Sequence, residues 1–229
     1  MIDIHAHIIP FIDDGSSSIE QSLAMIDEAI KQGITDIICT PHYRKNIFTA
    51  NVCEIEEKYQ MIKNRTKDKA IRLFLGQEIH CNKINEVLEM INKGTLITLN
   101  NSKYILLEFS YTNKIDISEV AYVTSLKGYI PIIAHIERYR YLDLETVKEI
   151  KNNGGLIQVN ASSLMGKEGA KQRKFVFTLF RERLVDFVAS DIHEKRRNWM
   201  SKAYRLVVRK FGQDYGQRVF YENGLSILL

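Results

Sequence analysis

The sequence lacks several features that would each point to a particular class of protein. It has only 3 cysteines among 229 residues, too few for a disulfide framework, so we expect a protein of the reducing cytoplasm. No apolar run approaches the roughly 18 residues of a transmembrane helix, and no basic leader precedes the first apolar run. We therefore expect neither membrane insertion nor a signal peptide. The net charge of +4 is too small to indicate nucleic-acid binding, although it would not repel an acidic substrate.

Proline is also rare, with 3 residues, and no low-complexity linker interrupts the chain. These absences predict no domain boundary, so we expect one domain over residues 1–229. With 45% hydrophobic and 26% charged residues, the chain can bury a sizeable core.

Short apolar runs alternate with longer amphipathic stretches along the whole chain. We expect strands at 1–4, 35–40, 71–76, 104–109, 129–134, 155–160 and 185–190. Helices are expected at 19–32, 52–67, 82–92, 117–127, 144–152, 168–183, 200–211 and 213–221. Near-continuous apolar strands separated by helices are typical of a parallel sheet buried on both faces. Seven such units fit an α/β fold of the closed or distorted (β/α) barrel type better than two Rossmann halves.

Histidines and carboxylates gather at the carboxyl ends of six predicted strands. They are His5, His7, His42, Glu78, Glu108, His135, Asp191 and His193. One such histidine alone would more often be a structural residue. In a barrel, however, these ends meet at one mouth, where so many imidazoles and carboxylates need a cation to be stable together. Asp14 adds a carboxylate after the first strand, although "DDGS" alone is typical of a turn.

The chemistry of these side chains narrows the metal. Imidazole and carboxylate ligands without thiolate suit Mn, Fe or Zn. Nine candidate ligands exceed what one ion can use, so we expect a cluster of two or three ions. Multi-ion sites with oxygen and nitrogen ligands typically cleave phosphate esters.

The ordered motifs "MIDIHAHIIPFIDDGS", "ICTPHYR", "GQEIH", "YILLEFS", "GYIPIIAHIERY" and "FVASDIH" resemble the polymerase-and-histidinol-phosphatase (PHP) superfamily. They resemble most its bacterial protein-tyrosine-phosphatase branch, the capsule and exopolysaccharide regulators of Gram-positive bacteria. The resemblance implies a distorted (β/α)7 TIM-like barrel, the PHP fold, with three divalent metal ions, most often Mn. The first ion would be held by His5, His7, Glu78 and Asp191. Glu78 would bridge to a second ion, completed by Glu108 and His135, and the third would be bound by Asp14, His42 and His193.

The resemblance also implies the reaction, which is hydrolysis of phosphotyrosine by a metal-activated hydroxide. Arg138, in "AHIERY", would hold the phosphate. A second arginine would follow "SDIH", where Arg196 and Arg197 both qualify and Arg197 is favoured because "RN" plus an aromatic residue matches the family stretch. Asp191 or His193 is the expected proton source, if one is needed. The implied substrate is the C-terminal tail of a cognate tyrosine kinase that controls capsule synthesis.

Other activities remain as alternatives at this point. A thiolate phosphatase needs Cys-x5-Arg, and none of Cys39, Cys53 and Cys81 has an arginine at that distance. A small-molecule phosphatase of the histidinol phosphatase type could use the same metal scaffold. A non-enzymatic metal-containing binding module is the third alternative. Among nearby polar residues, we expect His80 at the pocket rim, Asp13 in a turn, and Glu137 beside Arg138 to orient it.

Overall fold

The computed structural model describes all residues from 1 to 229, and a ring of short parallel strands forms its centre. The strands are β1 (Ile2–Ala6), β2 (Asp36–Cys39), β3 (His42–Tyr43), β4 (Arg72–Leu75), β5 (Glu78–His80), β6 (Tyr104–Glu108), β7 (Ile130–Ile133), β8 (Leu156–Asn160) and β9 (Phe187–Ala189). All seven predicted strands are present. The two additional strands, β3 and β5, continue the courses of β2 and β4 after short breaks.

The breaks have local causes. Pro41 between β2 and β3 has no N–H to donate to a ladder, and its carbonyl instead accepts a hydrogen bond from Glu78 N at 3.1 Å. Gly76 separates β4 from β5 where a side chain would collide, since an added Cβ would lie 2.6 Å from a Leu99 methyl group. Nine strands therefore occupy seven positions around the ring.

The strands curl into a barrel. One ladder has the order β1-β2-β4 and the other the order β3-β5-β6-β7-β8-β9, with parallel pairing throughout. The ladders meet where Asp191 N donates to His5 O at 2.9 Å and His7 N donates to Ile192 O at 3.0 Å. The predicted (β/α)7 architecture is confirmed.

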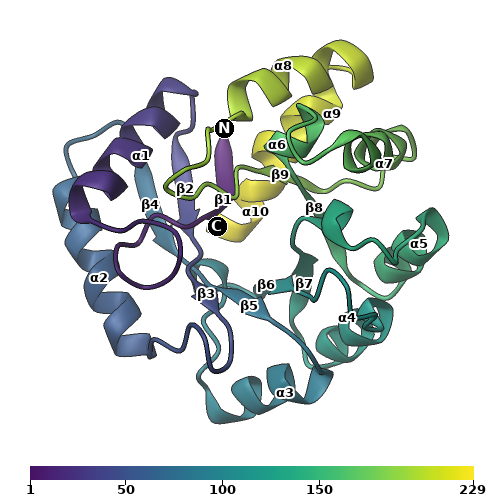
Figure 1. Ribbon diagram of the computed structural model, residues 1–229, viewed down its shortest axis with the longest axis horizontal. Coiled ribbons are helices and arrows are strands. Elements are labelled where there is room, and N and C mark those ends of the chain that lie inside the picture. Colours follow the sequence, from purple (N-terminus) through teal and green to yellow (C-terminus); the bar gives the residue numbers. More distant parts are fainter.

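Helices surround the strands (Figure 1). They are α1 (Ile19–Lys31), α2 (Val52–Arg65), α3 (Ile84–Lys93), α4 (Ile117–Leu126), α5 (Leu144–Asn152), α6 (Ala161–Leu164), α7 (Ala170–Arg181), α8 (Met200–Phe211), α9 (Gln213–Gln217) and α10 (Asn223–Leu228). Single turns form at η1 (Leu99–Asn101) and η2 (Ile136–Arg138), and a π-helical turn at η3 (Arg218–Glu222). The helix predicted at 213–221 is thus divided between α9 and η3, and α6 and α10 were not predicted. None of the helices combines the length and the apolar character needed to cross a membrane.

Local sequence explains where several helices begin and end. Ser18, Asn51, Asp116 and Asp143 each accept a hydrogen bond from a backbone N–H of the first turn that follows them. At the end of α5, Gly154 has φ +87°, and an added Cβ would lie 2.4 Å from Ser125 Oγ. Only glycine fits this position without strain.

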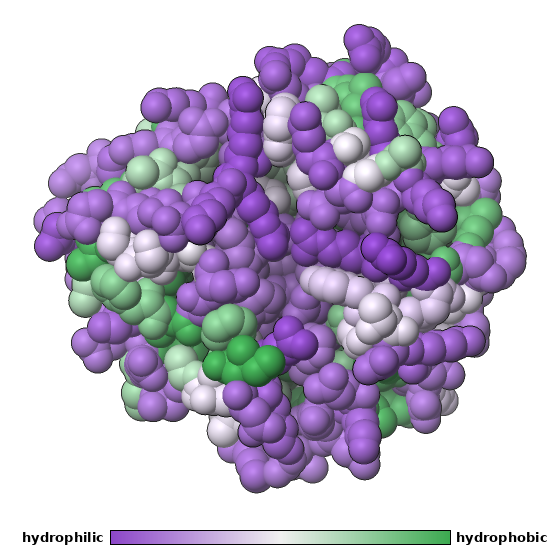
Figure 2. Space-filling model, viewed as in Figure 1, coloured by the Kyte–Doolittle hydropathy of each residue, from purple (hydrophilic) through white to green (hydrophobic).

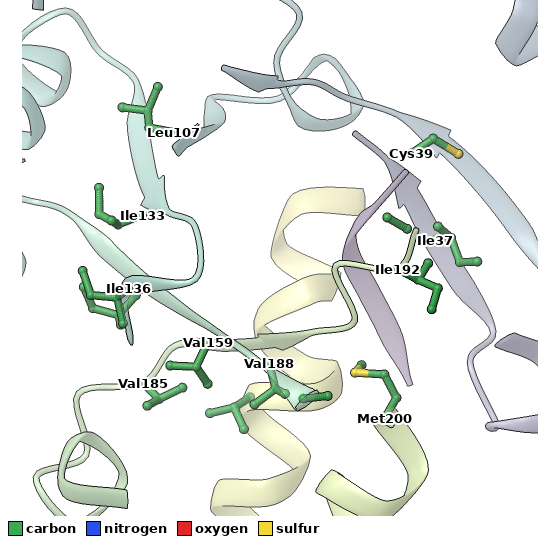
Figure 3. Close-up of a cluster of buried hydrophobic side chains, with 14 of the residues drawn as sticks. Ile37, Cys39, Leu107, Ile133, Ile136, Val159, Val185, Val188, Ile192 and Met200 are labelled. Atoms are coloured by element: carbon green, nitrogen blue, oxygen red, sulfur yellow. The ribbon is translucent and has the colours of Figure 1, made fainter. Parts of the chain in front are cut away.

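Alternation along the strands divides the core into two layers. Ile37, Cys39, Leu107, Ile133 and Val188 point outward into the large cluster under the helices (Figure 3). Their neighbours point into the barrel and form a smaller cluster, which includes Ile2, Ile4, Ile38, Leu106, Ile132, Phe187 and Ile227 of α10. This apolar interior occupies only the amino-terminal half of the barrel.

Polar side chains replace apolar ones toward the carboxyl ends of the same strands. In β1 the pairing register shifts between Asp3 and Ala6, an irregularity that changes which side chains face inward. Ile2 and Ile4 lie in the inner apolar cluster, yet the next inward side chains are His5 and His7. The loop that follows β1 lies in front of the strands in Figure 1, and hydrophilic residues surround the hollow at the centre of the same face (Figure 2).

Candidate metal centre

The nine predicted ligands converge at the carboxyl end of the barrel. Eight belong to overlapping groups whose ligand atoms lie within 4.8 Å of one another: His7, His42 and His193; His5, Glu78 and His135; His5, His7 and Asp191; His42, Glu78 and Glu108. The ninth, Asp14, lies at the rim, where its Oδ1 is 3.6 Å from His42 Nε2 and 3.5 Å from His193 Nε2. Residues up to 188 positions apart in sequence are thereby brought to one place.

Glu78 lies at the middle of the cluster and is fully buried. Its Oε2 is 3.1 Å from His5 Nε2, 3.2 Å from His7 Nε2 and 2.9 Å from His42 Nδ1. Its Oε1 is 2.8 Å from His135 Nε2. One carboxylate therefore faces four imidazoles, the arrangement expected of a bridging ligand.

The lone pairs in the cluster fit metal ions better than they fit hydrogen bonds. His5 Nε2 and His7 Nε2 are 3.0 Å apart, and each ring presents its Nδ1 to an acceptor oxygen, of Gln158 and Asp13 respectively. With the proton on Nδ1, both Nε2 atoms carry a lone pair, and neither can donate to the other. Buried atoms without a hydrogen-bond partner include Glu78 Oε2, His42 Nδ1 and His193 Nε2. Because buried polar atoms are normally paired, these atoms need a further partner between them. A nitrogen and oxygen donor set without thiolate suits Mn, Fe or Zn, so the residues present fit the predicted metals.

Electrostatics keep the acidic members of the cluster ionised. Burial raises the pKa of Glu78, but His5 and His42 outweigh it and hold the pKa well below the usual range. The hydrogen-bonding partner His193 lowers the pKa of Asp14 to about 2. Burial lowers the pKa of His193 itself, which favours the neutral imidazole. Burial lowers the pKa of His7 and of His42, but Asp13 and Glu78 hold the first, and Glu78 holds the second, above the usual range. Metal binding, which needs neutral imidazoles, would therefore release protons from these two side chains.

Two supporting residues orient the ligands from behind. Asp13 Oδ2 lies 2.7 Å from His7 Nδ1 and accepts a hydrogen bond from His42 N at 2.8 Å, so this turn residue fixes two of the candidate ligand histidines. Gln158 Oε1 lies 3.2 Å from His5 Nδ1 and accepts from His135 N at 2.8 Å. Gln158 was missed, although a glutamine inside an otherwise apolar strand is a signal that could have identified it.

Glu108 and Asp191 are held in the same way. His80 Nδ1 lies 3.0 Å from Glu108 Oε2, and Tyr111 OH donates to Glu108 Oε1 at 2.6 Å. His80 is therefore buried behind Glu108, whereas the sequence predicted it at the pocket rim. Asn160 Nδ2 donates to Asp191 Oδ2 at 2.8 Å. Glu137, expected to orient the neighbouring arginine, instead accepts a hydrogen bond from the backbone N–H of Asn160 at 2.9 Å.

The two oxygens of Asp191 face different groups. Oδ1 lies 3.6 Å from both His5 Nε2 and His7 Nε2, on the metal side. Oδ2 lies 2.8 Å from Arg138 Nη1 and 2.8 Å from Arg196 Nη1. Although burial raises the pKa of Asp191, Arg138 and His5 hold it well below the usual range.

The preference for Arg197 over Arg196 is not matched by the structure. The backbone N–H of Arg196 donates to His193 O at 3.0 Å, and this turn directs the Arg196 side chain back to Asp191. The Arg197 guanidinium instead lies over the ring of Trp199, with its central carbon 4.8 Å from the ring centroid.

Two predicted ligands have unusual backbone conformations. His135 follows β7 with φ +31°, and Asp191 follows β9 with φ +49°. Residues other than glycine in this region cost about 1–3 kcal/mol each and persist where the surroundings enforce them. This backbone conformation turns the chain at both strand ends, so that the side chains of His135 and Asp191 point into the mouth of the barrel.

Comparison with known proteins identifies the family. The sequence model described as "Capsular polysaccharide synthesis, CpsB/CapC" matches residues 1–229. The chain belongs to the CpsB/CapC family. The tyrosine-protein phosphatase CpsB of Streptococcus agalactiae is 35% identical, over 100% of this chain and 98% of that protein. The tyrosine-protein phosphatase YwqE of Bacillus subtilis is 35% identical, over 93% of this chain and 86% of that protein.

Solved structures agree with this membership. A structure of YwqE from Bacillus subtilis and CpsB from Streptococcus pneumoniae, described as unique metal-dependent tyrosine phosphatases, superimposes with a TM-score of 0.91. It is 33% identical and covers 100% of this chain and 94% of that chain. Histidinol phosphate phosphatase from Lactococcus lactis has a TM-score of 0.59 at 16% identity, over 92% of this chain and 93% of that chain, and shares the fold alone. The family resemblance predicted from the motifs is confirmed.

Proposed function

We propose that this CpsB/CapC family member is a metal-dependent tyrosine-protein phosphatase that acts in capsular polysaccharide synthesis. The observation that carries the proposal is the meeting of nine nitrogen- and oxygen-bearing ligands beside two arginines. Relatives that this chain matches over nearly their full length are named tyrosine-protein phosphatases. The metal-dependent chemistry expected from the ligand set agrees with the description of the YwqE and CpsB structures.

The proposed centre holds three divalent ions, most often Mn. His5, His7, Glu78 and Asp191 would hold the first ion. Glu78, Glu108 and His135 would hold the second, and Asp14, His42 and His193 the third. Such ions supply Lewis acidity toward a phosphoryl group and a water nucleophile activated at neutral pH.

The phosphate is proposed to lie against Arg138 and Arg196. Both guanidinium groups contact Asp191 Oδ2, and Arg138 Nη2 also contacts Glu168 Oε1 at 3.2 Å. These carboxylates fix the two side chains, and the remaining N–H groups can bind non-bridging phosphate oxygens. The planar guanidinium fork matches phosphate oxygens, whereas a lysine offers only a point charge. Asp191 thereby links the phosphate-binding arginines to the metal ligands.

Neither of the two predicted proton sources is expected to carry an acidic proton at neutral pH. Arg138 and His5 keep Asp191 ionised. Burial lowers the pKa of His193, so its imidazole is expected to be neutral. A phenolate is already a good leaving group, so we propose that the reaction needs neither residue as a general acid.

The cysteines take no part in the proposed chemistry. Burial raises the pKa of Cys39 and raises that of Cys81 to about 12, so neither forms a thiolate at neutral pH. Cys53 is exposed but lies on α2 with no arginine at the required spacing. Chelation should therefore abolish activity, and alkylation of thiols should leave it unchanged.

The proposed substrate is a phosphotyrosine protein, namely the C-terminal tail of a cognate tyrosine kinase. The proposed location is the cytoplasm, which suits three unpaired cysteines. The test is Mn-dependent dephosphorylation of a phosphotyrosine peptide by the wild type and by His135→Ala, with metal analysis of both. We expect the variant to lose metal and activity together. Faster hydrolysis of histidinol phosphate, or salt-sensitive DNA binding without any hydrolysis, would contradict the proposal.

A further inference from the structure

Arg140 is an exposed cation beside the phosphate-binding arginines that no acidic side chain neutralises. It comes two residues after Arg138, and the buried Tyr139 between them points into the core. Arg138 and Arg140 consequently face the same hollow, of about 460 Å³, which Arg196 also lines. A side chain that occupies this hollow meets Arg140 next to the proposed phosphate position.

The hollow continues outward along the surface. A neighbouring hollow of about 630 Å³ shares Arg140, Glu168 and Gln172 with the first. It extends past Lys171, at the start of α7, to the apolar side chains of Leu142 and Phe175. We call the two together the Arg140 groove. It leads from Arg138 and Arg196, which contact Asp191, to open surface, as a groove for an extended peptide must.

The Arg140 groove has an excess of positive charge. Of its two acidic residues, Glu168 is bound by Arg138 at 3.2 Å, and Glu137 is buried and accepts a hydrogen bond from Asn160 N. The first turn of α7 contains no acidic residue. Arg140 and Lys171 form no ion pair, so they are the cations left free to bind a ligand.

We propose that Arg140, with Lys171 beyond it, selects substrates with an anionic side chain close to the phosphotyrosine. This inference rests on the proposed function. An extended peptide advances about 3.3 Å per residue, so side chains one to three residues from the phosphotyrosine fall within the Arg140 groove. The guanidinium fork binds a carboxylate or a second phosphate in the same manner.

The test compares kcat/KM for phosphotyrosine peptides of equal length in the presence of Mn. The peptides carry glutamate, a second phosphotyrosine, alanine or lysine at the flanking positions. For the wild type, we expect kcat/KM about threefold to tenfold higher with an anionic neighbour than with alanine, and a smaller ratio at high salt. Arg140→Gln should remove this ratio, and Arg140→Glu should invert it in favour of lysine.

Arg205→Glu provides the matched control. Arg205 is exposed in the middle of α8. Its replacement by glutamate changes the net charge by the same amount as Arg140→Glu. We expect this variant to keep the wild-type ratio, which separates local recognition from general attraction. Thermal unfolding of each variant shows that its fold is retained.

The outcomes distinguish the inference from the proposed function. A preference for either anionic peptide that depends on Arg140 supports the inference, and the two peptides show whether a carboxylate suffices or a phosphate is needed. An active enzyme with equal kcat/KM for all peptides overturns the inference and leaves the proposed function intact. The same holds if Arg140→Glu keeps the wild-type preference. Failure of the wild type to hydrolyse any phosphotyrosine peptide overturns both.

Discussion

The two ends of the barrel are built from the same strands but carry opposite chemistry. In β6, Leu106 packs in the apolar interior and Glu108, two residues later, joins the cluster of candidate ligands. In β7, Ile132 lies in the interior, and His135 follows the strand at the mouth. One end buries hydrocarbon and the other buries charge. The apolar end therefore stabilises the fold, while the buried charges of the polar end are braced from behind and are arranged to hold metal ions.

The largest effect should come from Glu78→Gln at the polar end. This change keeps the shape of the side chain but removes the negative charge that four imidazoles share. We expect kcat/KM on a phosphotyrosine peptide to fall by at least about 100-fold, with fewer ions bound per chain. Rates and metal content measured on the same sample check this. A variant with full metal content and nearly wild-type activity would contradict the assignment of metal binding to the polar end.

Ile132→Ala is the matching change at the apolar end. Ile132 is fully buried, so the substitution leaves a cavity and should lower the free energy of unfolding by about 2–5 kcal/mol. Below the unfolding transition, metal content and kcat should stay near wild type. Urea unfolding together with metal analysis measures both quantities. Loss of metal with unchanged stability would show that the two ends are not separable.

Asp13→Asn tests the bracing of the polar end. The charged contact at 2.7 Å to His7 Nδ1 is weakened, while the side-chain volume is retained. Supporting residues of this kind are typically worth 10- to 100-fold in metal affinity, so we expect about a tenfold weaker affinity for Mn in a titration. Asp143→Asn, at the N-cap of α5, is the control, because asparagine caps a helix as well as aspartate does. Equal affinities in the two variants would contradict a role for Asp13.

The smallest expected change in kcat/KM comes from substitutions that distinguish Arg196 from Arg197. Arg196→Ala should lower kcat/KM by about tenfold, since a charge-assisted hydrogen bond contributes about 1.5–3 kcal/mol and this side chain is partly exposed. Arg197→Ala should change kcat/KM by less than about twofold, because Arg197 stacks on Trp199. Initial rates on one peptide decide between them. A larger loss in Arg197→Ala would restore the interpretation favoured by the sequence.

Much of the fold could be predicted because hydrophobic periodicity marks strands that are buried on both faces. The candidate ligands could be predicted because parallel strands bring their carboxyl ends to one mouth, and all nine predicted residues lie there. The strands β3 and β5 could not, because segments of two or three residues with polar side chains carry no periodicity. Gln158 was missed because its contact with His5 spans 153 residues. The choice between Arg196 and Arg197 depends on a turn, which the spacing alone does not determine.

Anomalous diffraction from crystals grown with Mn tests the central claim most directly, because it locates ions independently of activity. The account predicts three peaks at the carboxyl end of the barrel, among the nine side chains, with Glu78 between two of them. The absence of peaks there, or peaks bound by other residues, would contradict the account.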